Sequence, residues 1–295
     1  MTKTAWVFPG QGSQTVGMGA DLKDLPAAKN KLNLAEQILG WSVIEISQTD
    51  EARLSNTLYT QPCLYVIESI MADSLLARGE KPDLVAGHSL GEYVALYAAG
   101  VFDFETGLRL VKRRAELMHE AAGGKMVAMM KFDRQELEAA IDKNPDVTIA
   151  NDNSAAQVVI SGTPAAVDEI VATVKAKRAV TLKVSGAFHS KMMDSAAAEY
   201  RQQLESVNFS EAKIPVICNV EPSPTNDPEL IQQRLVKQMT GSVRWRETML
   251  QFPEIGISRV VEIGPGKVLT GLLKRTCREI EAVNLDRIVE PVAQL

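Results

Sequence analysis

Residues 84–93 read LVAGHSLGEY. The first four residues are small or apolar and predict a buried strand, whereas the stretch from Gly91 onward predicts a helix. Between them, glycines flank a serine in the pattern G-x-S-x-G, which is typical of a sharp turn from a strand into a helix. Ser89 is therefore predicted to stand at the tip of this turn with its side chain exposed.

The segments around this unit alternate between strand and helix patterns. Residues 6–8 are apolar and stop at Pro9-Gly10, which predicts a buried strand leading into a loop. In residues 61–79 apolar side chains recur at helical spacing, and this predicts a helix. Further strands are expected at 214–220 and 259–264, and a further helix at 229–240. Such alternation predicts an α/β fold with a mostly parallel sheet that helices cover on both faces.

The middle of the chain has a different order of elements. Strands are predicted at 126–132, 146–151, 157–162 and 179–184, and helices at 133–142 and 163–177. This β-α-β-β-α-β order is the ferredoxin-like arrangement. Gly123-Gly124 and Ser185-Gly186 flank it and are predicted hinges. We therefore expect a large discontinuous domain of residues 1–123 and 190–295, with a small domain of residues 124–189 inserted.

The composition restricts what the chain can do. Its 45% hydrophobic and 23% charged residues are ordinary for a soluble globular protein. The formal net charge of −5 argues against nucleic-acid binding, because phosphate contacts need a basic surface. The N-terminus lacks the apolar run of a signal peptide, and no stretch approaches the roughly 18 apolar residues of a membrane span. A soluble cytoplasmic protein that contacts neither nucleic acid nor membrane is expected.

The three cysteines, Cys63, Cys218 and Cys277, are scattered and have no histidine near them in the sequence. Metal-binding cysteines usually come in closely spaced pairs such as CxxC. We therefore expect reduced thiols and no metal site.

The G-x-S-x-G turn also has a chemical interpretation. It exposes the hydroxyl of Ser89, and the backbone N–H of Leu90 at the start of the helix can stabilise an oxyanion. Serine between glycines also occurs in ordinary turns, and this alternative stays open for the motif alone. The predicted strand before it and helix after it favour a nucleophile.

A serine nucleophile needs a neighbouring base, and the chain has three histidines. His88 directly precedes the serine, so its side chain should point away from that of Ser89. His119 is expected on the solvated face near the end of a helix. His189 follows the predicted insert in a Gly/Ser-containing loop, where catalytic groups are often placed. By elimination, His189 is the predicted base.

Residues 103–121 predict one amphipathic helix. At about 100° per residue the apolar side chains share one arc, and most charged side chains share the opposite arc. Arg114 is the exception, because it falls inside the apolar arc. A guanidinium that faces inward is costly unless an anion meets it, and its planar fork suits a carboxylate. The anion is either the far end of an acyl substrate or an internal Asp or Glu.

Five motifs, in order along the chain, resemble those of malonyl-CoA:acyl carrier protein transacylases. They are FPGQGSQ at 8–14, GHSLGEY at 87–93, the helix of Arg114, GAFHS at 186–190 and EIGPGKVL at 262–269. The resemblance covers essentially the whole chain. It implies an α/β-hydrolase-like core with a mostly parallel sheet and an inserted ferredoxin-like subdomain.

The resemblance also implies a role for each matched residue. Ser89 would be the nucleophile, His189 the base and Arg114 the clamp on the malonyl carboxylate. The backbone N–H groups of Gln11 and Leu90 would form the oxyanion hole.

Gln238, in LVKQM, matches the family position whose backbone carbonyl orients the histidine. A carbonyl can fix the tautomer of an imidazole without a buried charge. This would explain why no acid that completes a Ser-His-Asp set stands out in the sequence.

An enzyme of this family would carry malonyl from malonyl-CoA to the phosphopantetheine thiol of acyl carrier protein, supplying fatty acid synthesis. It would have no permanently bound cofactor. The GAFHS loop also resembles malonyl-loading acyltransferases of polyketide assembly lines, so that role stays open. A plain acyl-CoA or ester hydrolase is the other alternative, and Arg114 argues against it. Ser89 and His189 argue against a non-catalytic carrier-binding module.

The acidic carrier protein is expected to dock on a local basic patch. The candidates share closeness in sequence to the motifs and are Lys112, Arg113, Lys191, Lys267, Lys274 and Arg275. For each of them, an ordinary solvated side chain without a binding role is an equally good interpretation.

Overall fold

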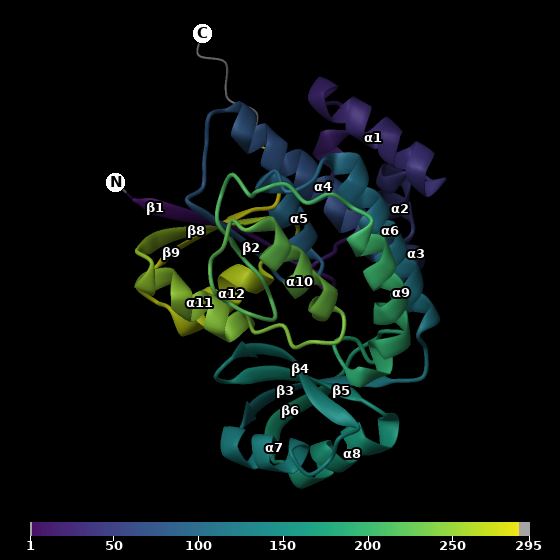
Figure 1. Ribbon diagram of the computed structural model, residues 1–295, viewed down its shortest axis with the longest axis vertical. Coiled ribbons are helices and arrows are strands. Elements are labelled where there is room, and N and C mark those ends of the chain that lie inside the picture. Colours follow the sequence, from purple (N-terminus) through teal and green to yellow (C-terminus); the bar gives the residue numbers. More distant parts are fainter. Residues whose placement is uncertain (1, 289–295) are drawn as a thin grey trace.

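The computed structural model describes residues 2–288, which contain two separate sheets (Figure 1). The larger sheet has the strand order β7-β2-β1-β8-β9. All of its neighbouring strands are parallel, as the alternation of elements predicted. Its strands are β1 (Lys3–Phe8), β2 (Leu84–Gly87), β7 (Val216–Ile217), β8 (Ile257–Ile263) and β9 (Glu281–Leu285).

Helices cover both faces of this sheet. Trp6 and Phe8 of β1 pack into one hydrophobic core, whereas Ala5 and Val7 pack into another on the opposite face. This follows from the geometry of a strand, in which successive side chains point to opposite sides. The first core contains side chains of α1, α2, α4, α5, α6, α9 and α10, and the second contains side chains of α11 and α12.

The helices of the larger unit have the following bounds. They are η1 (Ala20–Leu22), α1 (Pro26–Leu39), α2 (Val43–Thr49), α3 (Glu51–Leu54), α4 (Thr57–Ala77), α5 (Gly91–Ala98), α6 (Phe104–Glu120), η2 (Lys191–Met193), α9 (Asp194–Glu205), α10 (Pro228–Gln238), α11 (Trp245–Glu254) and α12 (Val268–Thr276). The two η elements are single 3₁₀ turns.

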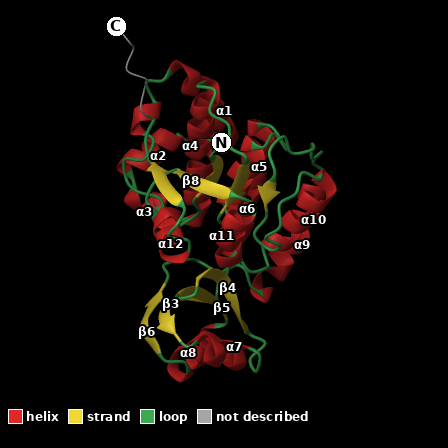
Figure 2. Ribbon diagram, turned by 90° about the vertical axis from the view of Figure 1, so that its left-hand side faces the viewer, coloured by secondary structure: helices red, strands yellow, loops and turns green. Residues whose placement is uncertain are grey.

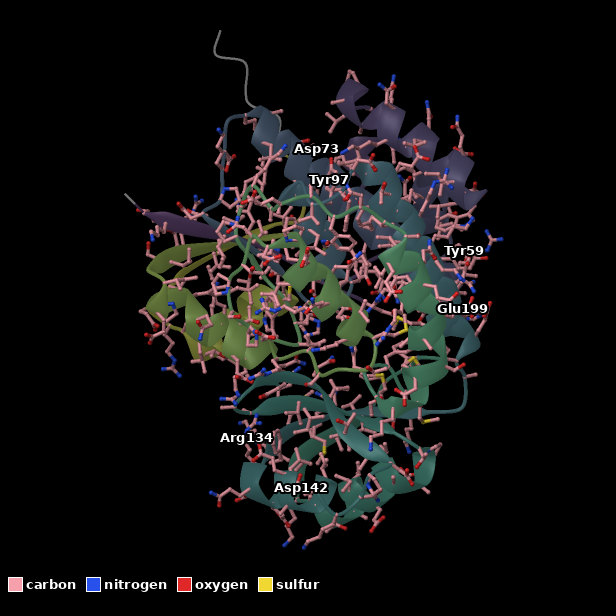
Figure 3. The ribbon with its side chains drawn as sticks, viewed as in Figure 1. Tyr59, Asp73, Tyr97, Arg134, Asp142 and Glu199 are labelled. Atoms are coloured by element: carbon pink, nitrogen blue, oxygen red, sulfur yellow. The ribbon has the colours of Figure 1, made fainter. Side chains whose placement is uncertain are left out.

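Helix α4 runs through the middle of the larger unit. It is apolar around most of its circumference, which is typical of a helix with neighbours on every side. It packs against α1, α2, α5 and α6. Near its end, Asp73 pairs with Lys31 of α1 and accepts a hydrogen bond from Tyr97 Oη of α5 at 2.6 Å (Figure 3). Within residues 2–288, no helix combines the length and apolar character that crossing a bilayer would demand.

The smaller sheet is antiparallel and has the strand order β4-β5-β3-β6. Its elements are β3 (Lys125–Phe132), α7 (Arg134–Ile141), β4 (Val147–Ser154), β5 (Gln157–Gly162), α8 (Pro164–Thr173) and β6 (Ala176–Thr181). Leu137 of α7 and Ile170 of α8 pack on Met129 of β3 and Ile160 of β5 in a core of their own. This is the predicted ferredoxin-like arrangement.

Strand β4 attaches the smaller sheet to the larger unit. The backbone of Val243 donates to Ala150 O at 2.8 Å and accepts from Asp152 N at 2.9 Å. The Asp152 carboxylate pairs with Arg246 of α11 at 3.0 Å and with Arg134 of α7 at 2.8 Å. Figure 2 shows the smaller sheet below the larger unit, with α7 and α8 on its far side. The smaller sheet is therefore tied to the larger unit by both backbone and side chains.

The two segments that connect the sheets lie side by side. A Cβ on Gly124 would come within 2.3 Å of Ala187 Cβ, and a Cβ on Gly186 would come within 2.2 Å of Ala121 O. Both glycines belong to the predicted hinges, and their lack of a side chain permits this close approach.

Three predicted elements have clearly different bounds in the structure. The strand expected at 179–184 is β6 (Ala176–Thr181), and the helix before it ends at Thr173. Antiparallel pairing with β3 begins opposite Phe132 at Ala176, so the strand starts earlier than its apolar pattern suggested. The apolar residues beyond Thr181 line a cavity instead.

The strand expected at 214–220 is also shorter. Only Val216 and Ile217 pair with β2, and β7 lies at the edge of the sheet. Asn219 then leaves the sheet, and its side chain hydrogen-bonds to the backbone of the turn that carries Ser89.

The close packing of the turn against β1 gives a testable prediction. A Cβ on Gly91 would lie 2.0 Å from Phe8 O, so we expect Gly91→Ala to destabilise the fold by at least about 1–3 kcal/mol. Gly271→Ala is the matched control, because that helical glycine has no contact nearer than Arg275 Nη2 at 4.0 Å. The control should gain about 0.5–1 kcal/mol from helix propensity. Thermal unfolding followed by circular dichroism would measure both, and an equal Tm for the two variants would contradict the packing argument.

Candidate active site

Ser89 stands at the tip of the strand-to-helix turn in a strained conformation. Its φ is 52°, in the left-handed region that side chains other than glycine rarely adopt. Asn219 holds the turn, because its Nδ2 donates to Gly87 O at 2.6 Å and its Oδ1 accepts from Ser89 N at 2.7 Å. These two bonds offset part of the strain and fix the hydroxyl above the end of β2.

His189 lies against the serine hydroxyl. The distance from its Nε2 to Ser89 Oγ is 2.8 Å. Its Nδ1 faces two backbone carbonyls, Gln238 O at 2.8 Å and Gly241 O at 3.1 Å. Carbonyls only accept, so Nδ1 carries the proton and Nε2 is free to accept the serine proton.

The environment keeps His189 neutral. The side chain is 3% exposed. Burial, followed by the nearby positive charge of Arg114, lowers the pKa of His189 to about 3. The imidazole is therefore unprotonated at neutral pH and is available as a base.

Arg114 extends from α6 to the hydroxyl of Ser89. It is 0% exposed, and its Nη2 donates to Ser89 Oγ at 3.1 Å and to Gln238 Oε1 at 3.0 Å. Its Nη1 donates to Gln61 Oε1 at 2.6 Å. Within residues 2–288 no carboxylate forms an ion pair with it. The internal Asp or Glu that the sequence left open is thus not found in the described chain.

Gln11 and Leu90 line the cavity above Ser89. The side chain of Gln11 donates to Thr57 Oγ1 at 2.9 Å, which anchors the loop after β1. This loop presses against the turn, since a Cβ on Gly10 would lie 2.3 Å from His88 O. The loop and the start of α5 therefore meet beside the serine.

The cavity has a volume of about 70 Å³. Its walls come from both sheets. Met118 belongs to α6, Met126 to β3, Leu182 and Val184 to the segment after β6, and Phe188 to the loop that carries His189. The smaller sheet thus closes one side of the site.

The side chains of the other two histidines do not contact the hydroxyl of Ser89. His88 Nε2 is 2.8 Å from Asn153 Oδ1 of β4, and its ring packs edge-on against Trp245. His88 therefore faces the smaller sheet and away from the serine hydroxyl, as expected. The expectation of a solvated His119 was wrong, because its side chain is partly buried beside Lys183 and Ser185 in a separate cavity.

Four amide and carboxylate side chains that surround Ser89, His189 and Arg114 were not predicted from sequence patterns. They are Gln61, Glu92, Asn219 and the side chain of Gln238. Glu92 directly follows the G-x-S-x-G pattern, so its position was a usable signal. Asn219 had none, because only the packing of β7 beside β2 brings it to the turn.

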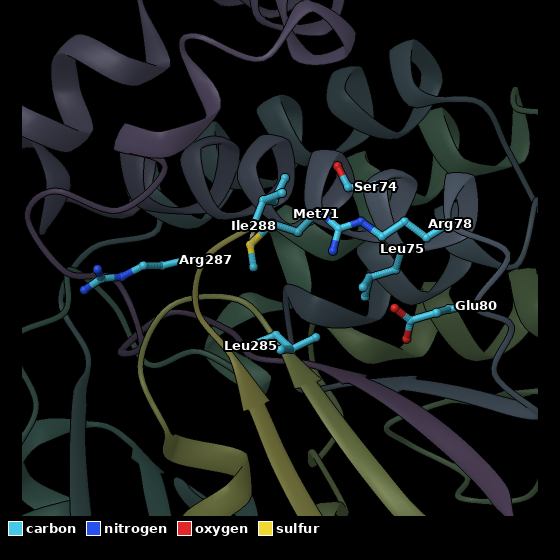
Figure 4. A pocket seen from close by; sticks show the side chains of 8 residues that line it. All are labelled: Met71, Ser74, Leu75, Arg78, Glu80, Leu285, Arg287 and Ile288. Atoms are coloured by element: carbon cyan, nitrogen blue, oxygen red, sulfur yellow. The ribbon is translucent and has the colours of Figure 1, made fainter. Parts of the chain in front are cut away.

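A further cavity of about 100 Å³ lies between the end of α4 and the end of β9 (Figure 4). Met71, Leu75, Leu285 and Ile288 give it an apolar lining, and it shares no residue with the Ser89 cavity. In the part of the chain that is described, no group of three or more His, Cys, Asp or Glu side chains could hold a metal ion.

A strained serine on a strand-to-helix turn, bonded to a neutral histidine, is the arrangement found in enzymes that use a serine nucleophile. Residues 5–292 match the family model described as "Acyl transferase domain", and the chain belongs to this family. The chain is an acyltransferase.

The relatives are more specific. The chain is 59% identical to the malonyl CoA-acyl carrier protein transacylase of Synechocystis sp. PCC 6803, over 97% of this chain and 98% of that one. The crystal structure of the Synechocystis malonyl-CoA:ACP transacylase superimposes with a TM-score of 0.95, over 97% and 98% of the two chains. A malonyl-transacylase solved in complex with a type II PKS acyl-carrier protein is 38% identical, with a TM-score of 0.92 over 97% of each chain. The predicted fold class is thereby confirmed.

The buried neutral His189 gives a prediction about stability and pH. Its pKa is lower in the folded chain than the ordinary 6.5, so the unfolded chain binds more protons as the pH falls. The contribution of this residue is fully present above pH 6.5 and is lost as the pH falls toward about 3. Between pH 6.5 and about pH 5, the wild type should lose roughly 1–2 kcal/mol more stability than His189→Gln.

Urea unfolding at a series of pH values would measure this difference. Ser89→Ala is the control, because it keeps His189 and should retain the wild-type slope. Identical slopes for the wild type and His189→Gln would mean that the imidazole is not buried in its neutral form.

Proposed function

We propose that this enzyme transfers malonyl from malonyl-CoA to the phosphopantetheine thiol of acyl carrier protein, through a malonyl ester of Ser89. One observation carries the proposal: a buried guanidinium lies 3.1 Å from the nucleophilic oxygen. The printed names of the relatives support the same substrate and the same partner. Neither substrate is a resident cofactor, because both leave after each turnover.

The distance between Ser89 and Arg114 suits a short diacid. Four bonds separate Ser89 Oγ from a terminal carboxylate oxygen of a malonyl ester, and they span at most about 5 Å. With Nη2 at 3.1 Å from Oγ, a bent malonyl unit can remain bonded to Oγ while its carboxylate meets the guanidinium. The carboxylate then replaces the hydroxyl as the partner of Nη2. It places a negative charge in direct contact with the guanidinium of Arg114.

In the first half-reaction Ser89 Oγ attacks the thioester carbonyl of malonyl-CoA while its proton passes to His189 Nε2. The C–S bond breaks, and the departing thiolate of coenzyme A takes that proton from the imidazolium. Gln238 O and Gly241 O hold the imidazole in the required tautomer and stabilise its positive charge. The N–H groups of Gln11 and Leu90 are the proposed donors to the oxyanion.

In the second half-reaction the phosphopantetheine thiol of the carrier protein enters the emptied site. His189 takes the thiol proton, the sulfur attacks the ester carbonyl, and the proton returns to Ser89 Oγ as the C–O bond breaks. Both halves use the same residues and one covalent intermediate, so ping-pong kinetics follow.

We propose fatty acid synthesis as the pathway supplied. The relative at 59% identity carries the plain transacylase name, whereas the complex with a polyketide carrier is at 38%. A simple hydrolase is disfavoured, because ester hydrolysis does not require a cation buried beside the nucleophile.

The six candidates for the carrier-binding patch differ in their contacts and in their distance along the chain from the site. Lys112 Nζ donates to Ile38 O, and Arg113 pairs with Glu116 and Glu199, so both are already engaged. Lys191 lies two residues from His189, and exposed Lys267 precedes α12 next to the loop that packs on Ser13. We propose Lys191 and Lys267 as carrier contacts. Lys274 and Arg275 lie at the far end of α12.

We also propose the division of the chain into residues 1–123 and 190–295 with 124–189 inserted. The separate hydrophobic core of the smaller sheet and the adjacent connecting segments support it. A cytoplasmic location is proposed on the basis of the three unpaired cysteines.

The covalent intermediate gives the first functional prediction. Brief incubation of the wild type with malonyl-CoA should add the mass of one malonyl group, and carrier protein bearing phosphopantetheine should remove it. Ser89→Ala should show no adduct. Intact mass spectrometry measures all three states, and a stable malonyl adduct on Ser89→Ala would overturn the assignment of the nucleophile.

The clamp gives the second functional prediction. Arg114→Ala should reduce kcat/KM for malonyl-CoA by about two orders of magnitude or more, because the substrate carboxylate loses a buried charged partner. Transfer from acetyl-CoA should be spared or increased. Arg113→Ala is the matched control, since it removes a neighbouring arginine whose partners are half exposed and whose loss should cost little. Equal loss for malonyl-CoA and acetyl-CoA in Arg114→Ala would count against the clamp.

A further inference from the structure

Arg114 is an interior cation whose direct partners are all neutral. Its hydrogen-bond partners are the Oε1 atoms of Gln61 and Gln238 and the hydroxyl of Ser89, and its Nε has none within residues 2–288. The guanidinium also lies over the ring of Tyr93, 5.4 Å from its centre, and this contact adds no negative charge. A fully buried guanidinium is strongly destabilising unless negative charge compensates it. The free enzyme must therefore balance this charge through something other than a direct ion pair.

The hydrogen bonds lead from Arg114 through Gln238 to Glu92. The Gln238 Oε1 accepts from Arg114 at 3.0 Å, while its Nε2 donates to Glu92 Oε2 at 2.9 Å and to Ser89 O at 2.7 Å. These partners fix the orientation of the amide, because a guanidinium only donates and a carboxylate only accepts. One carboxamide thus separates the cation from a carboxylate.

Glu92 is as deeply buried as Arg114. It is 0% exposed in the first turn of α5, and its Oε2 also accepts from Asn219 N at 3.2 Å. Burial raises the pKa of Glu92, and the bonds from Gln238 and Asn219 together with the charge of Arg114 oppose that rise. Burial is the largest of these influences, so the pKa of Glu92 lies above its ordinary value, and its Oε1 has no partner within residues 2–288; the two donors to Oε2 act toward the ionised form.

We propose that Glu92 is the counter-ion of Arg114 and that the Gln238 side chain is a spacer that keeps the two charges out of contact. A carboxylate in direct contact would occupy the guanidinium fork and compete with the substrate. Without any carboxylate, the cation would remain unbalanced in the free enzyme. With the spacer, the side of the fork that faces Ser89 stays open to the carboxylate of the substrate. Both are positioning residues, and they set the preference for anionic acyl groups.

This inference rests on the proposed function, and kinetics with two substrates test it. Glu92→Gln removes the charge and keeps an acceptor for Gln238 and Asn219. We expect its KM for malonyl-CoA to fall by about threefold or more, because Arg114 becomes less compensated. The ratio of its kcat/KM for malonyl-CoA to its kcat/KM for acetyl-CoA should therefore rise, since acetyl carries no charge for Arg114 to bind and any disturbance of the turn affects both substrates alike.

Gln61→Glu is the opposite variant. Gln61 Oε1 already contacts Arg114 at 2.6 Å, and Gln61 makes no bond to Glu92 or to the turn, so the change places a carboxylate directly on the guanidinium. The KM for malonyl-CoA should rise by about tenfold or more, with acetyl transfer much less affected.

Thermal unfolding of each variant, measured alongside the kinetics, separates a purely structural role from an electrostatic one. Equal losses for both substrates together with a lowered Tm would overturn the inference, as would an unchanged KM for malonyl-CoA in Glu92→Gln. If the wild type itself formed no malonyl adduct, the proposed function would fail. If the wild type transferred malonyl and the opposite shifts in KM were absent, only the role of Glu92 and Gln238 would fail.

Discussion

The burial of one positive charge governs the architecture of this site. Arg114 lies on the apolar face of α6, where it is completely shielded from water, and its direct partners are amide oxygens and a hydroxyl. Water cannot solvate the guanidinium there, so the surrounding side chains must supply its hydrogen-bond acceptors and compensate its charge. Burial lowers the pKa of His189, and the positive charge of Arg114 lowers it further. The same charge favours an anionic group beside Ser89.

A second constraint is the strain at Ser89, and the two constraints share residues. Asn219 holds the backbone of the turn at Gly87 O and at Ser89 N, and the same residue donates its N–H to Glu92. Gln238 accepts from the base with its backbone and contacts the turn and Arg114 with its side chain. Ser89, His189 and Arg114 therefore belong to one hydrogen-bonded unit, in which no member is positioned independently of the others.

Sequence patterns predicted the residues whose type or spacing is unusual in itself. Ser89 has a motif, Arg114 breaks a helical period, and His189 is what remains when two other histidines are set aside. The fold class followed from the alternation of strands and helices. The supporting amides could not be predicted, because a glutamine or asparagine takes its role from tertiary neighbours. The strand expected at 179–184 was misplaced for a related reason: its apolar alternation continues past the sheet into a cavity wall.

The segment that leaves β6 has a wider consequence. Leu182 and Val184 line the cavity, yet they follow the smaller sheet in the chain, and β4 of that sheet is joined to the larger unit at Val243. The smaller sheet thus contributes to the cavity wall itself and also carries the segment that contributes Leu182 and Val184. Grafting it from a relative with a different acyl preference would exchange part of the substrate chamber along with the scaffold. Chimeras of this fold therefore carry the donor's chamber shape with the donor's small sheet, even when Ser89, His189 and Arg114 all come from the recipient.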